Sequence, residues 1–436
     1  MTESFSSKKV YLGVCLTGFT LLFFQVLSSP AEAKYDEILF YPNLLLFQQY
    51  GLSVYSLLNI KNQAPGPLYE LIHSFFSSFT ALQFPAVRYV NFLLLVLMTV
   101  LLYRILQEVF KSEDAFIKAF SLMTVPMLWS IGGLALTEIP TLFFGVLTLY
   151  FYFAISPART FTANTVYAVL CGFSLGLTIL GRTQFLVIFL TMGLFVRSAP
   201  KSLFFIRSLT LLIAAFVCFP VFYLWKGLTP PTLRYQSETN LFYGFLALSY
   251  SSMAFFILAP SWFYIKRRHL PYYAALLCAA LAVNLKFELY HYLGFNSLLS
   301  RLKNPELLHL LSLVIPCLFV PVAWLFLSGF FYRLREQRNH KEQTFLYVSF
   351  LLLILSSVKV SHIFSPRYVA QALPLAVLMA APYFTLNRWR VGIGIAGIAI
   401  GSFSLNAYYV KKYNYDHWSY RVRDLGPRHP AGASRP

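Results

Sequence analysis

Long apolar runs separated by short polar connections repeat along the whole chain. Most runs are about 20 residues long, the length at which a helix crosses the hydrocarbon core of a bilayer. We expect spans at roughly 10–29, 86–109, 116–133, 139–155, 163–180, 184–197, 203–225, 241–265, 271–285, 308–332, 344–359, 366–384 and 390–410. Several runs are short enough to merge with a neighbour or to re-enter the same face. The pattern therefore predicts an all-α integral membrane protein, a bundle of about 13 transmembrane helices.

The composition supports this interpretation. Hydrophobic residues make up 58% of the 436 residues and charged residues 12%, which is about half the charged share of an average soluble domain. No long polar stretch interrupts the apolar runs. We therefore expect one polytopic transmembrane domain over residues 1–410 and a basic C-terminal tail over 411–436, whose end, rich in Gly, Pro and Arg, is expected to be disordered.

A net charge of +19 would suggest a nucleic-acid partner in a soluble protein. Here most Lys and Arg residues lie in short connections between apolar runs, where positive charge sets the orientation of a membrane protein. Lys8 and Lys9 place the N-terminus in the cytoplasm, and six further basic connections then face the same side, whereas the basic tail after Tyr409 does not. We infer that membrane lipids, and no nucleic acid, are the partners of these charges. Binding an anionic lipid phosphate is a second use for them.

Other polar groups gather at the opposite ends of the predicted helices. They occupy eight segments: 36–37, 63–69, 88, 137–138, 182–184, 226–240, 286–305 and 362–367. A transporter is expected to keep its key polar groups near the middle of the bilayer, and Lys359, close to the end of a span, is the nearest case here. The pattern therefore favours chemistry at the extracytoplasmic surface.

The first outer loop, about residues 30–85, is the longest. Residues 37–50 read as an amphipathic interfacial helix, with one face formed by residues 44–47. The sequence Pro65-Gly66-Pro67 breaks the chain, and residues 68–79 read as a second interfacial helix with aromatic anchors. These helices either roof a cavity or simply connect the spans along the membrane surface.

Three carboxylates near the membrane boundary are candidates for chemistry, because a charge placed in hydrocarbon costs at least a few kcal/mol and tends to mark function. Asp36 is the candidate catalytic base; the alternative is that Asp36 and Glu37 solvate the end of the first span. On a helix these neighbours point about 100° apart, so they are expected to do different jobs. Glu138 either complements a helix dipole, with Thr137 at the cap and Pro140 just inside, or binds a sugar hydroxyl.

Several cations on the same side could hold an anionic ligand. Arg182 and Arg367 each sit between apolar runs, with His362 shortly before Arg367. An Arg fork matches a pair of phosphate oxygens, whereas the alternative for each is an arginine that snorkels to the surface. Arg88, at the entry of the second span, is a third candidate, and its alternative is an interfacial anchor.

The sequence contains no His or Cys cluster with metal-ligand spacing and no glycine-rich phosphate loop. We therefore expect no metal and no cofactor. The five cysteines all lie inside apolar runs, where they are expected to be small buried hydrophobic residues without disulfide partners.

The order of these motifs resembles the GT-C superfamily of polyprenyl-phosphate-sugar glycosyltransferases. More narrowly, it is similar to the dolichyl-phosphate-glucose α-1,2-glucosyltransferase family. Where that family tends to place a histidine after the acidic pair, this chain has Phe40. The matching stretches are Tyr35-Asp36-Glu37-Ile38, Gln49-Tyr50-Gly51, Pro65-Gly66-Pro67-Leu68-Tyr69, Arg88-Tyr89-Val90-Asn91, Thr137-Glu138, Arg182-Thr183-Gln184, Arg367-Tyr368 and Leu373-Pro374.

The resemblance implies a hexosyltransferase-type enzyme that moves a sugar from a polyprenyl-phosphate carrier to an acceptor hydroxyl with inversion. Asp36 and Glu37 would be the catalytic residues. The acceptor would be a lipid-linked molecule, a glycan or a protein, and the active site would face the periplasm or the lumen of the endoplasmic reticulum. Its candidate substrate-binding residues are Glu138, Arg182, Gln184, Arg88, Tyr69, His362 and Arg367.

Two other functions fit the same pattern. One is a transporter or flippase of lipid-linked sugars, and the other is a ligase that transfers an undecaprenyl-linked oligosaccharide. A bacterial inner membrane and the endoplasmic reticulum are both compatible with the sequence.

Overall fold

The computed structural model of the chain describes residues 2–61, 63, 66–197, 200–232, 240–263, 267–288, 304–359 and 364–411. Every regular element within these ranges is helical. The longer helices are α1 (Thr2–Leu27), α6 (Ala86–Arg104), α9 (Glu138–Ala154), α10 (Phe161–Gly181), α12 (Lys201–Trp225), α13 (Leu241–Leu258), α14 (Leu270–Phe287), α16 (Pro305–Cys317), α17 (Phe319–Glu336), α18 (Lys341–Leu355) and α21 (Arg388–Val410).

Shorter helices connect or interrupt these. They are α2 (Glu37–Tyr50), α3 (Val54–Leu58), α4 (Leu68–Phe75), α5 (Ser77–Thr80), η1 (Ile105–Val109), α7 (Ala115–Phe120), η2 (Ser121–Thr124), α8 (Pro126–Gly133), η3 (Thr183–Phe185), α11 (Leu186–Val196), η4 (Pro260–Trp262), η5 (Arg267–His269), η6 (Ser356–Lys359), α19 (Arg367–Ala370), α20 (Leu373–Ala380) and η7 (Ala381–Tyr383).

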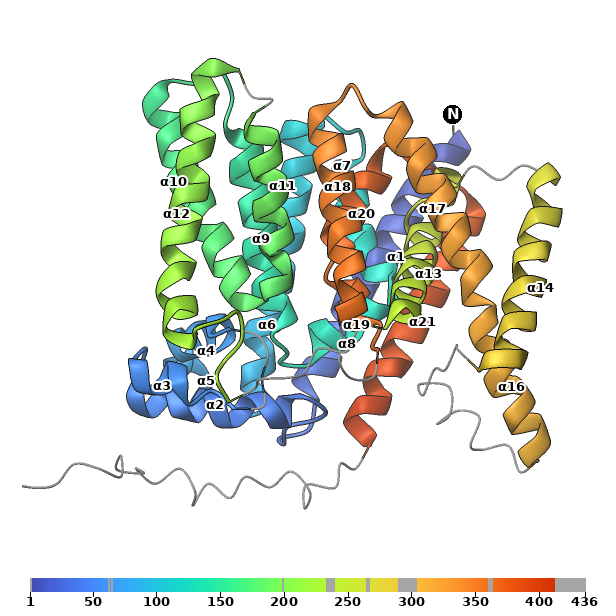
Figure 1. Cartoon of the computed structure of the whole chain (residues 1–436), viewed down its shortest axis with the longest axis horizontal. Helices are drawn as coiled ribbons and strands as arrows, with labels where there is room; N and C mark the ends of the chain where they lie inside the picture. Colours follow the sequence, from blue (N-terminus) through green and yellow to red (C-terminus); the bar gives the residue numbers. More distant parts are fainter. Residues whose placement is uncertain are drawn as a thin grey trace, which may run out of the picture.

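Within the described ranges, nine helices are long and apolar enough to cross a membrane. They run roughly side by side in Figure 1. The chain is therefore an all-α, multi-pass integral membrane protein, as the apolar runs predict. The expected total of 13 spans is not confirmed. The run 116–133 is two helices bent by 80°, and the runs 139–155, 184–197 and 366–384 correspond to shorter apolar helices.

Helices α2, α3, α4 and α5 gather at one end of the bundle, beside the ends of α10 and α12 (Figure 1). The first predicted interfacial helix is α2, with the expected bounds 37–50. Its inward face repeats at helical spacing through Phe40, Leu44 and Phe47, all buried in the main core. The second predicted helix is divided into α4 and α5, with Phe76 between them.

Two long-range contacts fix these outer helices to the bundle. The Trp225 indole N–H at the end of α12 donates to the Leu57 carbonyl in α3 at 2.9 Å. At the start of α4, a Cβ built on Gly66 would lie 2.1 Å from the carbonyl oxygen of Leu180. Only glycine allows this approach without a shift of the backbone. The chain before α4 is thereby held against the end of α10, next to Arg182.

Candidate active site

Four charged side chains of alternating sign form a connected row at the ends of four helices. Asp36 is the residue before α2, Glu138 is the first residue of α9, Arg182 follows α10, and Arg367 is the first residue of α19. Nη1 of Arg367 forms an ion pair with Oδ2 of Asp36. Nε of Arg367 also lies 3.7 Å from Oε1 of Glu138, and Nη2 of Arg182 donates to that same oxygen at 2.5 Å.

Helix ends explain the sign of three of the four charges; the fourth, Arg367, lies at the N-terminus of α19 and is balanced instead by Asp36 and Glu138. Asp36 and Glu138 lie at helix N-termini, where the partial positive charge of the dipole stabilises a carboxylate. Arg182 lies at a C-terminus, where a cation is favoured. Thr137 makes no side-chain cap for α9; instead, its hydroxyl accepts a hydrogen bond from Nη2 of Arg182 at 2.9 Å. The simple capping explanation for Thr137 therefore does not hold.

The row is mostly buried but retains unused hydrogen-bonding capacity. The exposed fractions of the side chains are 20% for Asp36, 11% for Arg367, 6% for Arg182 and 0% for Glu138. Nη1 of Arg367 is occupied by Asp36, whereas Nε of Arg367 and Nε of Arg182 donate no hydrogen bond within the described part of the chain. The arginines are thus not surface anchors. They present free donors beside a partly exposed carboxylate, which suits an anionic ligand.

Tyrosine rings enclose the Asp36–Arg367 end of the row. The guanidinium carbon of Arg367 lies 5.5 Å from the ring centroids of both Tyr35 and Tyr368, and the Tyr35 ring lies 4.9 Å from that of Tyr408. Burial raises the pKa of Tyr35 well above its usual value, so this phenol stays neutral. Opposite charges from Glu138 and Asp36 hold the pKa of Arg367 well above its usual value, despite the burial that would lower it.

The backbone of Tyr35 is strained, with φ at +55° in the left-handed region. Such a conformation costs about 1 kcal/mol or more for a residue with a side chain and tends to occur at functional sites. The strain lies in the residue directly before Asp36. It sets the direction in which Asp36 enters α2.

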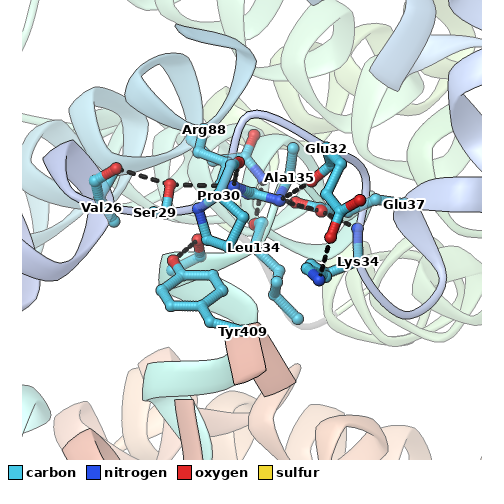
Figure 2. Close-up of polar contacts among 12 residues, drawn as sticks. Val26, Ser29, Pro30, Glu32, Lys34, Glu37, Arg88, Leu134, Ala135 and Tyr409 are labelled. Atoms are coloured by element: carbon cyan, nitrogen blue, oxygen red, sulfur yellow. Dashed lines mark hydrogen bonds and ion pairs between the residues drawn. The ribbon is translucent and has the colours of Figure 1, made fainter. Parts of the chain in front are cut away.

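Glu37 belongs to a separate, fully buried ion pair with Arg88 (Figure 2). Nε and Nη2 of Arg88 donate to the two carboxylate oxygens at 2.8 and 2.6 Å. The other acceptors of this guanidinium are Ser29 Oγ, Pro30 O and Glu32 O. Five N–H groups therefore meet five acceptors. The backbone N–H groups of Lys34 and Ala135 complete the shell of Glu37.

This geometry argues against the roles predicted for Glu37 and Arg88. Arg88 is neither a surface anchor nor a substrate-binding residue, because each of its donors is already engaged inside the protein. Glu37 accepts four hydrogen bonds and is 0% exposed, so it has no capacity left to contact a sugar. The pair instead ties the start of α2 to α6 and to the segment before α9, and thereby positions Asp36.

The remaining predicted site residues lie outside the charged row. Tyr69 is buried in α4, with its ring 5.8 Å from that of Phe40. Gln184 is half-buried in η3, two residues after Arg182. His362 lies outside the described residues.

Two further ionisable residues, Glu70 and His73, are completely buried in α4 and have no role predicted from the sequence. Neither side chain makes a hydrogen bond within the described ranges. Burial raises the pKa of Glu70 to about 8 and lowers the pKa of His73 to about 3, so both are neutral at pH 7. Their three-residue spacing in an apolar helix is the signal that would have revealed them.

Within the described ranges, no three His, Cys, Asp or Glu side chains are placed to hold a metal ion. The charged row supplies a carboxylate that can accept a proton and two guanidinium groups that can stabilise an anion.

Comparisons with known proteins reveal distant similarity. A family model described as dolichyl-phosphate-mannose-protein mannosyltransferase matches residues 63–225, a little over a third of the chain. The match includes Glu138 and Arg182 but not Asp36 or Arg367. A comparison with curated protein sequences finds no match.

Among solved structures, the chain is similar to ArnT from Cupriavidus metallidurans in the apo state, with a TM-score of 0.44 and 13% identity over 90% of this chain and 76% of that one. For the same protein bound to undecaprenyl phosphate, the TM-score is 0.43 and the identity is 13%, over 91% of this chain and 77% of that one. The third structure is the archaeal oligosaccharyltransferase AglB from Archaeoglobus fulgidus, solved with an inhibitory peptide and a dolichol-phosphate. Its TM-score is 0.45 and its identity 15%, over 96% of this chain and 58% of that one.

Proposed function

We propose that this chain is a membrane glycosyltransferase of the GT-C type. It moves a sugar from a polyprenyl-phosphate carrier to the hydroxyl group of a lipid-linked, glycan or protein acceptor. The reaction inverts the anomeric configuration, and Asp36 is the general base. The active site faces the periplasm of a bacterial inner membrane or the lumen of the endoplasmic reticulum.

The observation that carries this proposal is the ion pair between Asp36 and Arg367, together with Nε of Arg367, which donates no hydrogen bond within the described ranges. Transfer from a lipid phosphate requires a base for the acceptor and a cation for the leaving group, in contact with the same reacting centre. Asp36 and Arg367 provide both groups. The row continues through Glu138 to Arg182, which adds a second guanidinium group with a free donor.

In this mechanism, Asp36 takes the proton from the acceptor hydroxyl as its oxygen attacks the anomeric carbon. The bond between that carbon and the phosphate oxygen breaks on the opposite face, which inverts the configuration. The polyprenyl phosphate leaves with the bonding electron pair, and the free donors of Arg367 and Arg182 stabilise its charge. The donor is already activated, so the step requires no nucleotide.

The family match supports the donor class, because the matching model describes transfer from a dolichyl-phosphate sugar. The matched residues include Glu138 and Arg182, which hold the phosphate end of the proposed site. The position of the row at the end of the bundle occupied by α2 supports chemistry at one membrane surface. The basic connections of the sequence suggest that this surface is extracytoplasmic.

The test is a transfer assay with purified wild-type protein, R367Q and R104Q. Each is incubated with a panel of radiolabelled polyprenyl-phosphate sugars and a membrane lipid extract. We expect product with wild type and a fall of roughly 10²- to 10³-fold with R367Q, since a donor to the leaving phosphate is lost. R104Q removes an equal charge from an exposed pair with Glu108 and is expected to behave as wild type.

Equal rates for R367Q and wild type would refute the role of Arg367. A second arm uses sealed vesicles. Movement of the labelled sugar across the membrane without a new glycosidic bond would favour a flippase and overturn the transferase.

A further inference from the structure

Arg390 is a buried cation without an acidic partner. It lies in the first turn of α21, and 1% of it is exposed. Nε, Nη1 and Nη2 donate no hydrogen bond within the described part of the chain. Arg88 is equally buried, yet all of its donors are engaged. Burying an unpaired charge costs several kcal/mol, so Arg390 lacks a counter-ion that its environment calls for.

The surroundings of Arg390 are aromatic rather than acidic. Its guanidinium carbon lies 3.9 Å from the ring centroid of Phe384 and 5.5 Å from that of Tyr11. These ring faces offset part of the cost of burial. They leave the donor edge of the guanidinium without an acidic partner in the described ranges. The Tyr11 hydroxyl is also buried without a hydrogen-bond partner in the described ranges, which adds a neutral donor beside the cation.

Nearby ionic groups pair with one another and give Arg390 no counter-ion. Asp114 forms an ion pair with Lys8 at 2.7 Å. Nζ of Lys118 lies 5.9 Å from the same Phe384 ring and donates to Ser112 at 2.7 Å. Arg390 and Lys118 therefore both lie near the Phe384 ring.

The position of Arg390 matches the depth of lipid headgroups. The side chain lies one turn into the candidate span Arg388–Val410 and next to the start of the span Ser7–Leu27. The N-terminus of α1 lies at the end of the bundle opposite α2 (Figure 1). Arg390 is thus remote from the row containing Asp36 and independent of the proposed transfer reaction.

We infer that Arg390 is the centre of a second anion site, whose ligand is a phosphate oxyanion supplied either by an acidic lipid headgroup or by free phosphate. The planar guanidinium donates to two phosphate oxygens, and the Tyr11 hydroxyl and Lys118 add a donor and a charge. Basic pockets between membrane helices are suited to such headgroups. The ligand joins α1 and α21 at the membrane boundary.

The test measures the thermal midpoint of the full chain in neutral detergent. Dioctanoyl phosphatidylglycerol, dioctanoyl phosphatidylcholine and inorganic phosphate are each titrated into wild type, R390Q and R388Q. Arg388 is exposed in the same turn, so R388Q is a matched loss of charge. A ligand that binds only the folded state raises the midpoint. We expect phosphatidylglycerol to raise it by several degrees in wild type and R388Q, and not in R390Q.

The arms separate the two sources of phosphate. A shift with phosphatidylglycerol alone assigns a lipid headgroup, and an equal shift with inorganic phosphate assigns the free anion. A shift of the same size in R390Q, or no shift in wild type with either anion, would overturn the site. Should R390Q not fold, R390K keeps the charge and loses the planar fork. Its half-saturating concentration is expected to rise about tenfold, and an unchanged value would also overturn the inference.

Discussion

Asp36 and Glu37 are adjacent in the chain but have opposite environments. Glu37 is sealed inside a shell of four donors, whereas Asp36 is partly exposed and forms an ion pair with Arg367. A base must be able to reach an acceptor, and only Asp36 can. Buried Glu37 fixes the backbone and thereby holds Asp36 in place.

Removing one partner of the Glu37–Arg88 pair is expected to be strongly destabilising. E37Q or R88Q leaves the other charge buried without a partner, which costs about 3–5 kcal/mol. The measurement is the free energy of unfolding in detergent. We expect the double variant E37Q/R88Q to lose less than the sum of the two single losses, because no charge remains unpaired. Additive losses would contradict the pairing shown in Figure 2.

Glu70 and His73 give the outer helices opposite pH dependences. The folded pKa of Glu70 is raised from 4.5 to about 8, so the folded state holds this proton more tightly and stability falls as the pH rises through this window. The folded pKa of His73 is lowered from 6.5 to about 3, so stability falls as the pH drops through that window. Between pH 4.5 and 6.5, the contributions of Glu70 and His73 to the pH dependence of stability therefore have opposite signs.

The resulting prediction concerns E70Q. As the pH rises from 6.5 to 8, the thermal midpoint of wild type is expected to fall because Glu70 loses its proton. E70Q has no proton to lose there and is expected to show no such fall. E306Q changes an exposed glutamate and serves as the control with the wild-type slope. An E70Q profile parallel to that of wild type would show that Glu70 is not buried as a neutral acid.

At the scale of elements, the site depends on where helices begin and end. Four helix ends converge on the charged row, and α4 is held against α10 at the position of closest approach, Gly66 to Leu180. The short α19 presents Arg367 and packs its other residues, Tyr368 to Ala370, into the main core. The ends of α9 and α10 thus place Glu138 and Arg182, and the shorter helices α2 and α19 place Asp36 and Arg367 beside them.

Gly66→Ala tests this arrangement. The added methyl group would lie 2.1 Å from the Leu180 carbonyl oxygen, so α4 must move away from the end of α10. We expect a loss of about 1–3 kcal/mol of stability and a larger loss of sugar transfer, because Arg182 directly follows α10. The control is G13A, since a Cβ at Gly13 meets nothing within 4 Å. Normal transfer by G66A would show that this contact does not position the site.

For the whole molecule, the sequence was most informative about the membrane helices, since apolar periodicity is local. It was less informative about their geometry. Pro126 marks the place where the run 116–133 bends, but length alone made that run look like one span. The charged row could be anticipated as separate residues at one membrane surface. Its pairings could not, because Asp36 and Arg367 belong to opposite ends of the chain.

The limits of local reasoning are clearest for the arginines. A snorkelling residue, a substrate ligand and a buried structural partner share the same sequence signature, an arginine beside an apolar run. Arg88 proved to be the partner of Glu37, Arg367 contacts Asp36, and Arg390 has no acidic partner in the described ranges. Only long-range packing distinguishes these three arginines. The same residue type therefore has a different role at each of the three positions.

The central claim is that Asp36 removes the proton during sugar transfer. The most direct test is a single-turnover experiment that compares wild type with D36N, using D114N as a matched change in an ion pair remote from the site. D36N is predicted to bind the polyprenyl-phosphate sugar with similar affinity and to transfer it roughly 10²- to 10⁴-fold more slowly, whereas D114N transfers it normally. Transfer by D36N at the wild-type rate would contradict the account.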